Sequence, residues 1–186
     1  MIAWGIGFAG GVLGWTLLEY ALHRWAFHRS ALGRWAARGH LKHHARPEYF
    51  YALAGKVALA SVVLAPIVLV SVLAMGASLG ASIPLGILAG WLVYEVIHRR
   101  IHVAAPLGRY GRWARRHHLH HHFGRADRNF GVTTPLWDLV LGTSSARGVV
   151  RVPRQHAPKF PWLLDTAARD VAPRVAPAFA TEYRIV

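Results

Sequence analysis

Histidine is the residue type whose spacing in this sequence could do chemistry. The chain has 13 His and no Cys, and twelve of the His fall into two clusters, at 23–44 and 98–122. In chain order they form the patterns HX4H, HX2HH, HX3H and HX2HH. The residues of these patterns are His23, His28, His40, His43, His44, His98, His102, His118, His121 and His122. Imidazole suits iron, zinc, copper and nickel, so the patterns predict a metal site.

The spacings indicate how the imidazoles could share metal ions. Residues three or four apart lie on one face of a helix, as His98 and His102 would. His23 and His28 are five apart, about 140° around an ideal helix, so they share an ion only where the helix bends or ends. Ten imidazoles exceed the roughly six ligands of an octahedral ion, and two metal ions are therefore expected.

Three carboxylates near the patterns could support the ligands. Glu19 lies four residues before His23, and Glu95 lies three before His98. Each could accept the distal ring N–H of its His. Asp138 could orient a ligand or cap a helix.

Three histidines fall outside the patterns. His117 and His120 flank the predicted ligand face, where a supporting or surface role is expected, and His156 is expected at the surface.

The elements that position the clusters are apolar. From Val57 to Tyr94 there are 38 residues without a charge or a His, enough for two membrane crossings of about 20 residues each. We predict spans at 53–74 and 78–97, with the break near Met75–Ser78. A further apolar stretch predicts a first span at 2–22. A signal peptide is the weaker interpretation of that stretch, because no basic residues precede it and no clear cleavage site follows.

The basic residues predict the topology. Six lie at 24–46 and fifteen at 99–184, so the positive-inside rule places the 23–51 loop and everything after 98 in the cytoplasm, with the N-terminus outside. The predicted fold is an all-α integral membrane helical bundle with about three transmembrane helices. A cytoplasmic helical cap, 23–51 and 98–144, would hold the two-metal site. We expect one domain over 1–186 that ends in a basic, Pro-rich tail, 145–186.

Composition excludes several classes. With 54% hydrophobic residues the chain is not disordered, and without Cys it has no disulfide scaffold, thiolate zinc site or iron–sulfur cluster. The formal charge of +14 would suit anionic lipid head groups or an acidic partner, and no nucleic-acid partner is expected.

The patterns resemble those of the fatty acid hydroxylase/sterol desaturase superfamily of integral-membrane, histidine-box oxygenases. The similar segments are 19–28 (EYALHRWAFH), 40–44 (HLKHH), 116–123 (RHHLHHHF) and 129–143 (NFGVTTPLWDLVLGT). The last is the most specific. The resemblance covers about 19–143 and leaves the tail uncovered.

This resemblance implies a non-haem di-iron oxidoreductase. It would use two Fe ions (zinc in some purified proteins), O2 as co-substrate and an external electron donor, and would hydroxylate a fatty-acyl or related lipid chain. A desaturase or a sterol- or carotenoid-type oxidase is the nearest alternative. A membrane metal-binding or transport protein is the alternative from another class, although it would place His or acids at the membrane midplane, where the predicted spans have none. The high Ala, Arg and Gly content is typical of a GC-rich bacterium, so we expect the protein in a bacterial inner membrane.

Electrons would come from a separate protein, cytochrome b5-like or ferredoxin-type. An acidic carrier could dock on a basic face. That face would comprise Arg99, Arg100, Arg109, Arg112, Arg115 and Arg116. Contact of the same arginines with lipid phosphates is an equal alternative.

Overall fold

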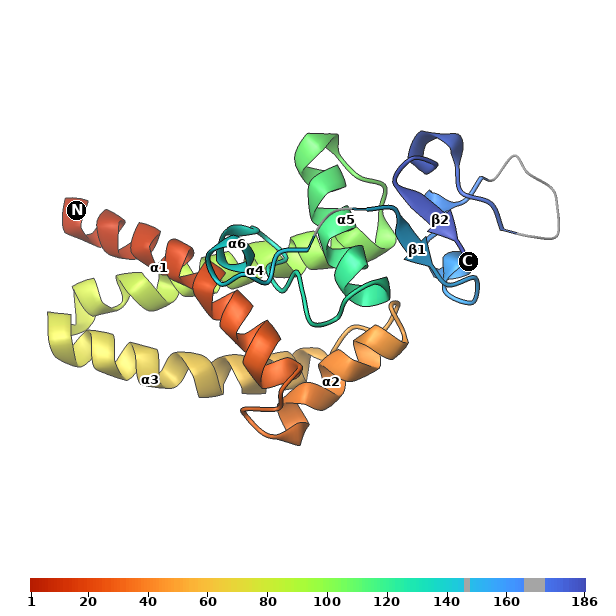
Figure 1. Cartoon of the computed structure of the whole chain (residues 1–186). Coiled ribbons are helices and arrows are strands. Elements are labelled where there is room, and N and C mark those ends of the chain that lie inside the picture. The colour runs from red at the N-terminus through yellow and green to blue at the C-terminus, as the bar shows by residue number, and fades with distance from the viewer. Residues whose placement is uncertain (146–147, 166–172) are drawn as a thin grey trace. The chain divides into compact units, whose positions relative to one another are not determined.

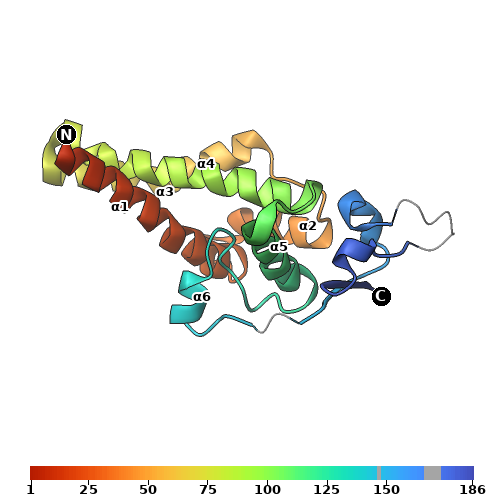
Figure 2. The same cartoon turned by 90° about the horizontal axis from the view of Figure 1, so that it is seen from above.

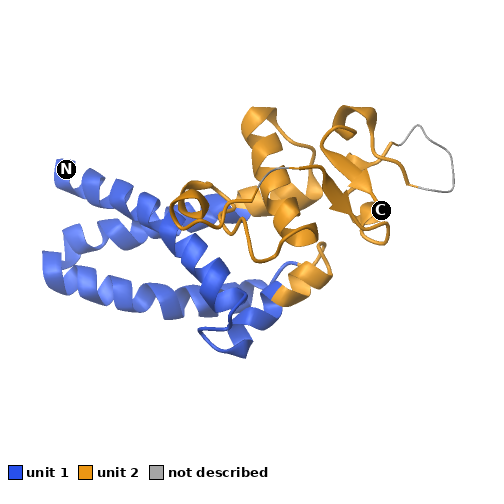
Figure 3. Ribbon diagram, in the orientation of Figure 1, with its two compact units in different colours: residues 1–40, 50–95 blue, residues 41–49, 96–186 orange. Residues whose placement is uncertain are grey.

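The computed structural model describes residues 1–145, 148–165 and 173–186. The chain forms two compact units (Figure 3): unit 1 is residues 1–40 and 50–95, and unit 2 is residues 41–49 and 96–186. Two helices pass from one unit into the other. α2 (Arg34–Ala45) leaves unit 1 after His40, and α4 (Ser82–Val103) leaves it after Glu95. The single domain over 1–186 stays a prediction.

Unit 1 is built from long apolar helices. α1 (Ile2–Ala21) continues into a π-helical turn, η1 (Leu22–Phe27), and α3 runs over Leu53–Gly80. Among the described residues, Ile2–Phe27 and Leu53–Gly80 are long and apolar enough to cross a membrane. The third predicted span lies in α4 and is not confirmed, because the last turns of α4 carry Glu95, His98 and two Arg.

The predicted break between the second and third spans is confirmed. Gly76 has φ 76° and ψ 163°, outside the helical region, within the stretch Leu53–Gly80. A positive φ costs glycine nothing sterically, so the chain can turn there. After Ala81 the chain continues as α4, and α3 and the unit 1 part of α4 form an antiparallel hairpin (Figure 1).

Glycine allows α1 to approach α4 within unit 1. A Cβ atom on Gly86 would lie 2.1 Å from the Phe8 carbonyl oxygen, and one on Gly11 would lie 2.1 Å from the Ile83 carbonyl oxygen. The two backbones therefore touch, as small residues permit in membrane helices. The N-terminal half of α1 accordingly lies beside the turn of the hairpin (Figures 1 and 2).

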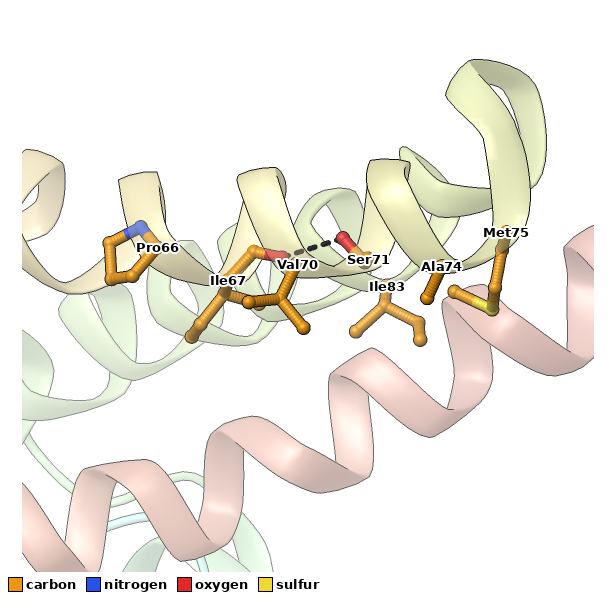
Figure 4. A pocket seen from close by; sticks show the side chains of 7 residues that line it. All are labelled: Pro66, Ile67, Val70, Ser71, Ala74, Met75 and Ile83. Carbon is orange, nitrogen blue, oxygen red and sulfur yellow. Dashed lines mark hydrogen bonds between the residues drawn. The ribbon is translucent and has the colours of Figure 1, made fainter.

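Most of α3 presents apolar side chains at the surface, including Val62, Leu69 and Leu73. An open groove of about 490 Å³ runs between α3 and Ile83 of α4 (Figure 4). The Ser71 hydroxyl in this groove donates to the Ile67 carbonyl, 2.6 Å away, so its one polar side chain is paired within the helix. Such a surface suits lipid contact.

Unit 2 contains the rest of α2 and α4, then α5 (Gly108–Phe123) and the short α6 (Leu136–Val140). The described residues of the predicted tail form short elements of secondary structure. It holds β1 (Val150–Val152), the 3₁₀ turns η2 (Ala157–Lys159), η3 (Pro161–Leu163) and η4 (Pro177–Phe179), and β2 (Tyr183–Ile185).

β1 and β2 pair in parallel, with Val150 opposite Tyr183, so the all-α prediction is wrong for this segment. Strands of three residues carry too little alternation to be read from sequence. The parts of the predicted tail at 146–147 and 166–172 lie outside the described residues.

Candidate metal centre

Unit 2 brings five of the predicted ligands together. They are His43 from α2, His98 and His102 from α4, and His118 and His122 from α5. One nitrogen from each lies within 4.8 Å of the others. The Nε2 atoms of His43 and His98 are 3.1 Å apart, and His118 Nε2 lies 3.1 Å from the Nε2 atoms of both His102 and His122. We name this set the five-histidine cluster.

These separations fit a shared metal ion. Imidazole nitrogens bind zinc or a similar divalent ion at about 2.0–2.1 Å, so neighbouring ligand atoms around one ion stand roughly 3.0–3.4 Å apart. The Nε2 pairs in the cluster fall in this range. An all-imidazole set is also the ligand type that iron, zinc and copper accept.

The protonation of the cluster suits metal binding. Burial, with the positive potential of neighbouring His residues second, holds the pKa values of His102, His118 and His122 well below the usual imidazole value. These rings are therefore neutral at pH 7, the form that binds metals. His43 Nδ1 lies 2.7 Å from the Tyr49 carbonyl and donates to it, which leaves Nε2 available as the ligand atom.

A second, smaller group lies in unit 2. The Nε2 atoms of His44 and His121 are 3.2 Å apart. His121 Nδ1 donates to the Arg128 carbonyl at 2.6 Å, which again leaves Nε2 as the ligand atom. The HX2HH pattern of α5 is thus divided, since His118 and His122 join the five-histidine cluster and His121 turns to His44.

Unit 1 holds three predicted ligands. His40 Nε2 lies 3.1 Å from His23 Nε2 and 3.0 Å from His28 Nε2. The π-helical turn explains how two His residues five positions apart can lie close together. Its backbone hydrogen bonds span five residues, and the His28 N–H donates to the His23 carbonyl at 3.2 Å. The wider turn brings the two rings to 5.2 Å between centroids. Burial lowers the pKa of His28 to about 4, so this ring too is neutral.

The three carboxylates differ in their surroundings. Asp138 is fully buried, and its Oδ2 lies 3.1 Å from His117 Nε2. It therefore touches a His next to a predicted ligand, not one of the ten. Glu95 accepts from Trp91 Nε1 at 3.2 Å and pairs with Lys56, both in unit 1. Glu19 is buried. Support of a ligand by Glu19 or Glu95 stays a prediction.

Sequence reasoning did not identify two buried contacts of unit 2. His117, for which a supporting or a surface role was expected, is buried and lies against Asp138, a pairing that spacing cannot reveal across 21 positions. Arg115 was expected on an exposed basic face, and this is wrong: its side chain is buried and faces the end of α4, because α5 packs that side inward. His120 and His156 are half-buried and lie outside the groups above.

Comparisons with known proteins show the family of this chain. A family model described as fatty acid hydroxylase matches residues 8–143. The dihydroceramide fatty acyl 2-hydroxylase FAH2 of Arabidopsis thaliana is 36% identical over 144 residues, which are 75% of this chain and 60% of that protein. The fatty acid 2-hydroxylase of Homo sapiens is 30% identical over 140 residues, 72% of this chain and 38% of that protein.

A solved structure is also similar. The full-length scs7p structure, in which only the hydroxylase domain is visible, has a TM-score of 0.66 and 30% identity, covering 78% of this chain and 57% of that one.

The fold and the site define a mostly helical protein with membrane-type apolar helices and clustered imidazoles that could bind a metal ion. The chain belongs to the fatty acid hydroxylase family. It spans 60% or less of the length of these relatives.

Proposed function

We propose that this protein is an O2-dependent lipid hydroxylase that inserts oxygen into a C–H bond of a fatty-acyl or related lipid chain. The observation that carries the proposal is the five-histidine cluster, in which imidazoles from three helices converge through their Nε2 atoms. The relatives named as fatty acyl 2-hydroxylases support the lipid substrate and the reaction type.

Two ions would be bound by the ten predicted ligands. The five-histidine cluster would hold one. The second ion is proposed from the number of ligands in the sequence patterns, because ten imidazoles exceed what one ion can use. A di-iron centre is the proposed form, because zinc has no redox chemistry of its own.

Bound iron would supply the redox chemistry in which a C–H bond, O2, two electrons and two protons give an alcohol and water. The residues of this chain would do the rest. The Tyr49 and Arg128 carbonyls accept hydrogen bonds from Nδ1 of His43 and His121, respectively, and so fix the orientation of the two rings. Nε2 of each ring would then face a bound ion. Burial of His102, His118 and His121 keeps water from the reacting region.

The apolar surfaces of α1 and α3 support a membrane location, where the lipid substrate would approach laterally. A cytoplasmic metal centre, an N-terminus on the other side and a bacterial inner membrane stay part of the proposal. A separate electron-transfer partner also stays part of the proposal, and the exposed basic residues of α4 and α5 would attract it. Arg115 does not contribute, because its side chain is buried, and Arg112 forms an ion pair with Glu182 at 3.2 Å.

The test compares host lipids by mass spectrometry after expression of the protein with a reductant. The wild type should add one oxygen to an acyl chain, and the double variant His118→Ala, His122→Ala should not. His156→Ala, a matched His removal outside the ligand groups, should retain the activity. An acyl chain that has lost two hydrogens instead would show that the enzyme is a desaturase and not a hydroxylase. Unchanged lipids despite bound metal would overturn the enzyme proposal in favour of metal binding or transport.

A further inference from the structure

The C-terminal segment, 148–186, lies beyond the family match, which ends at residue 143. Its described residues, 148–165 and 173–186, are nevertheless well packed. The side chains of Val152, Ala157, Phe160 and Leu163 have no solvent exposure. β1 contacts α5, and the Lys159 ammonium pairs with Glu48 at 3.1 Å. The segment is therefore an integral part of unit 2.

This segment reaches one ligand of the five-histidine cluster directly. Trp162 Nε1 donates a hydrogen bond to the His102 carbonyl at 3.1 Å. The ring of the buried Phe160 lies 6.0 Å from the His102 imidazole, centroid to centroid. The backbone and the ring of His102 thus both contact residues that the family match does not include.

Arg115 joins the same contact from α5. Its guanidinium carbon lies 4.2 Å from the centre of the Trp162 ring, a cation–π distance. Nε donates to the Ile101 carbonyl at 2.9 Å, and Nη2 donates to the Arg100 carbonyl at 2.8 Å and to the Ala104 carbonyl. Together with the Trp162 bond to His102, these two side chains bind the carbonyls of four of the five residues at positions 100–104, at the end of α4. Val103 is the position that they do not bind.

The end of a helix is where such support matters. The last four carbonyls of a helix have no partners within it, and the last turn frays unless other groups bind them. A cation at this end also interacts favourably with the helix dipole. α4 ends at Val103, one residue after His102, so an unsupported last turn would move this ligand.

We infer that Arg115 and Trp162 are positioning residues that clamp the end of α4 and so hold His102 in the five-histidine cluster. The C-terminal segment is then needed for one metal ion of the pair. This inference rests on the proposed function insofar as the cluster binds metal. The inference goes beyond that function because it makes a segment outside the family match necessary for tight metal binding. It concerns the ion in the five-histidine cluster and not the second ion.

The test uses full-length purified protein in detergent, reconstituted with Co²⁺, whose absorption spectrum reports the ligand geometry. Trp162→Phe keeps an aromatic ring beside Arg115 and removes the N–H donor. Arg115→Lys keeps the charge and removes the fork of donors. Loss of such outer support typically costs about 10- to 100-fold in metal affinity. We expect each variant to release one Co²⁺ at a chelator concentration at least tenfold lower, with a changed spectrum, while the other Co²⁺ is retained as in the wild type.

Trp35→Phe is the matched control, because Trp35 is an exposed residue of α2 in unit 1. It should bind both ions as the wild type does. Unchanged affinity and spectrum in Trp162→Phe and Arg115→Lys would overturn the inference. Equal weakening of both ions would also overturn it, because that result indicates general destabilisation. If Trp162→Phe does not fold, Arg115→Lys decides by the same criteria. A wild type that binds no metal refutes the proposed function, a result distinct from failure of the clamp.

Discussion

The His117 imidazole and the Asp138 carboxylate form a buried pair, with exposed fractions of 1% and 0% and 3.1 Å between Nε2 and Oδ2. The carboxylate also accepts the Phe130 and Gly131 N–H groups, each at 2.8 Å, and the Thr143 hydroxyl at 2.7 Å. His117 precedes the predicted ligand His118 in α5. Asp138 therefore ties the loop that follows α5 to the helix that supplies three predicted ligands.

Asp138→Asn should lower the free energy of unfolding. The amide group would replace one acceptor oxygen by a donor, leaving a buried N–H group facing another donor, which costs about 1–3 kcal/mol. Chemical denaturation followed by circular dichroism measures the change. Asp127→Asn is the control, since this carboxylate is 63% exposed and pairs with Arg125, and its stability should match the wild type. Equal effects of the two substitutions would contradict the role of Asp138.

Removal of single ligands should show two separable ions. His102 belongs to the five-histidine cluster, whereas His40 is the central ring of the unit 1 group. We expect His102→Ala and His40→Ala each to reduce the metal content from two ions to one per chain, measured by elemental analysis. His156→Ala should retain both. Loss of both ions in either ligand variant would argue against two independent sites.

The contact between α1 and α4 should tolerate no side chain at Gly86. A methyl group there would meet the Phe8 carbonyl at 2.1 Å, and overpacking of this kind costs about 1–3 kcal/mol. Gly86→Ala should therefore lower the melting temperature in detergent. At Gly10, in contrast, a Cβ would have no neighbour within 4 Å, so Gly10→Ala should melt no earlier than the wild type. A Gly86→Ala protein as stable as Gly10→Ala would refute this packing.

Metal removal should destabilise the folded chain. An ion at about 100 times its dissociation constant adds about 2.7 kcal/mol when it binds only the native state. Chelation should lower the melting temperature, and added Fe²⁺ or Zn²⁺ should restore it. The double variant His40→Ala, His102→Ala should respond far less. A wild type whose melting is indifferent to chelator would show that these rings are structural.

Much of the site could be predicted from the sequence because its signals are local. Spacings of three and four residues in His98–His102 and His118–His122 indicate one helix face, and Gly76 lies in the predicted turn. Spacing could not show that His121 separates from His118 and His122, since that division depends on which partners the other elements bring. The five-residue spacing of His23 and His28 does not fit one face of an α-helix, and only the structure shows that the π-helical backbone of η1 brings the two rings together.

The remaining misses share a physical cause. The Arg115 and Trp162 contacts join positions far apart in the sequence, as do the His117 and Asp138 side chains. β1 and β2 are short and find each other across a long intervening stretch. Local propensity and periodicity contain no record of such pairings.

The position of Trp162 in the chain also sets an order of events during synthesis. All five rings of the cluster, from His43 to His122, leave the ribosome before Trp162. The support at the end of α4 therefore cannot be complete until translation has passed Trp162. Until then the nascent chain has every ligand of this cluster but not the contacts that hold His102 in place.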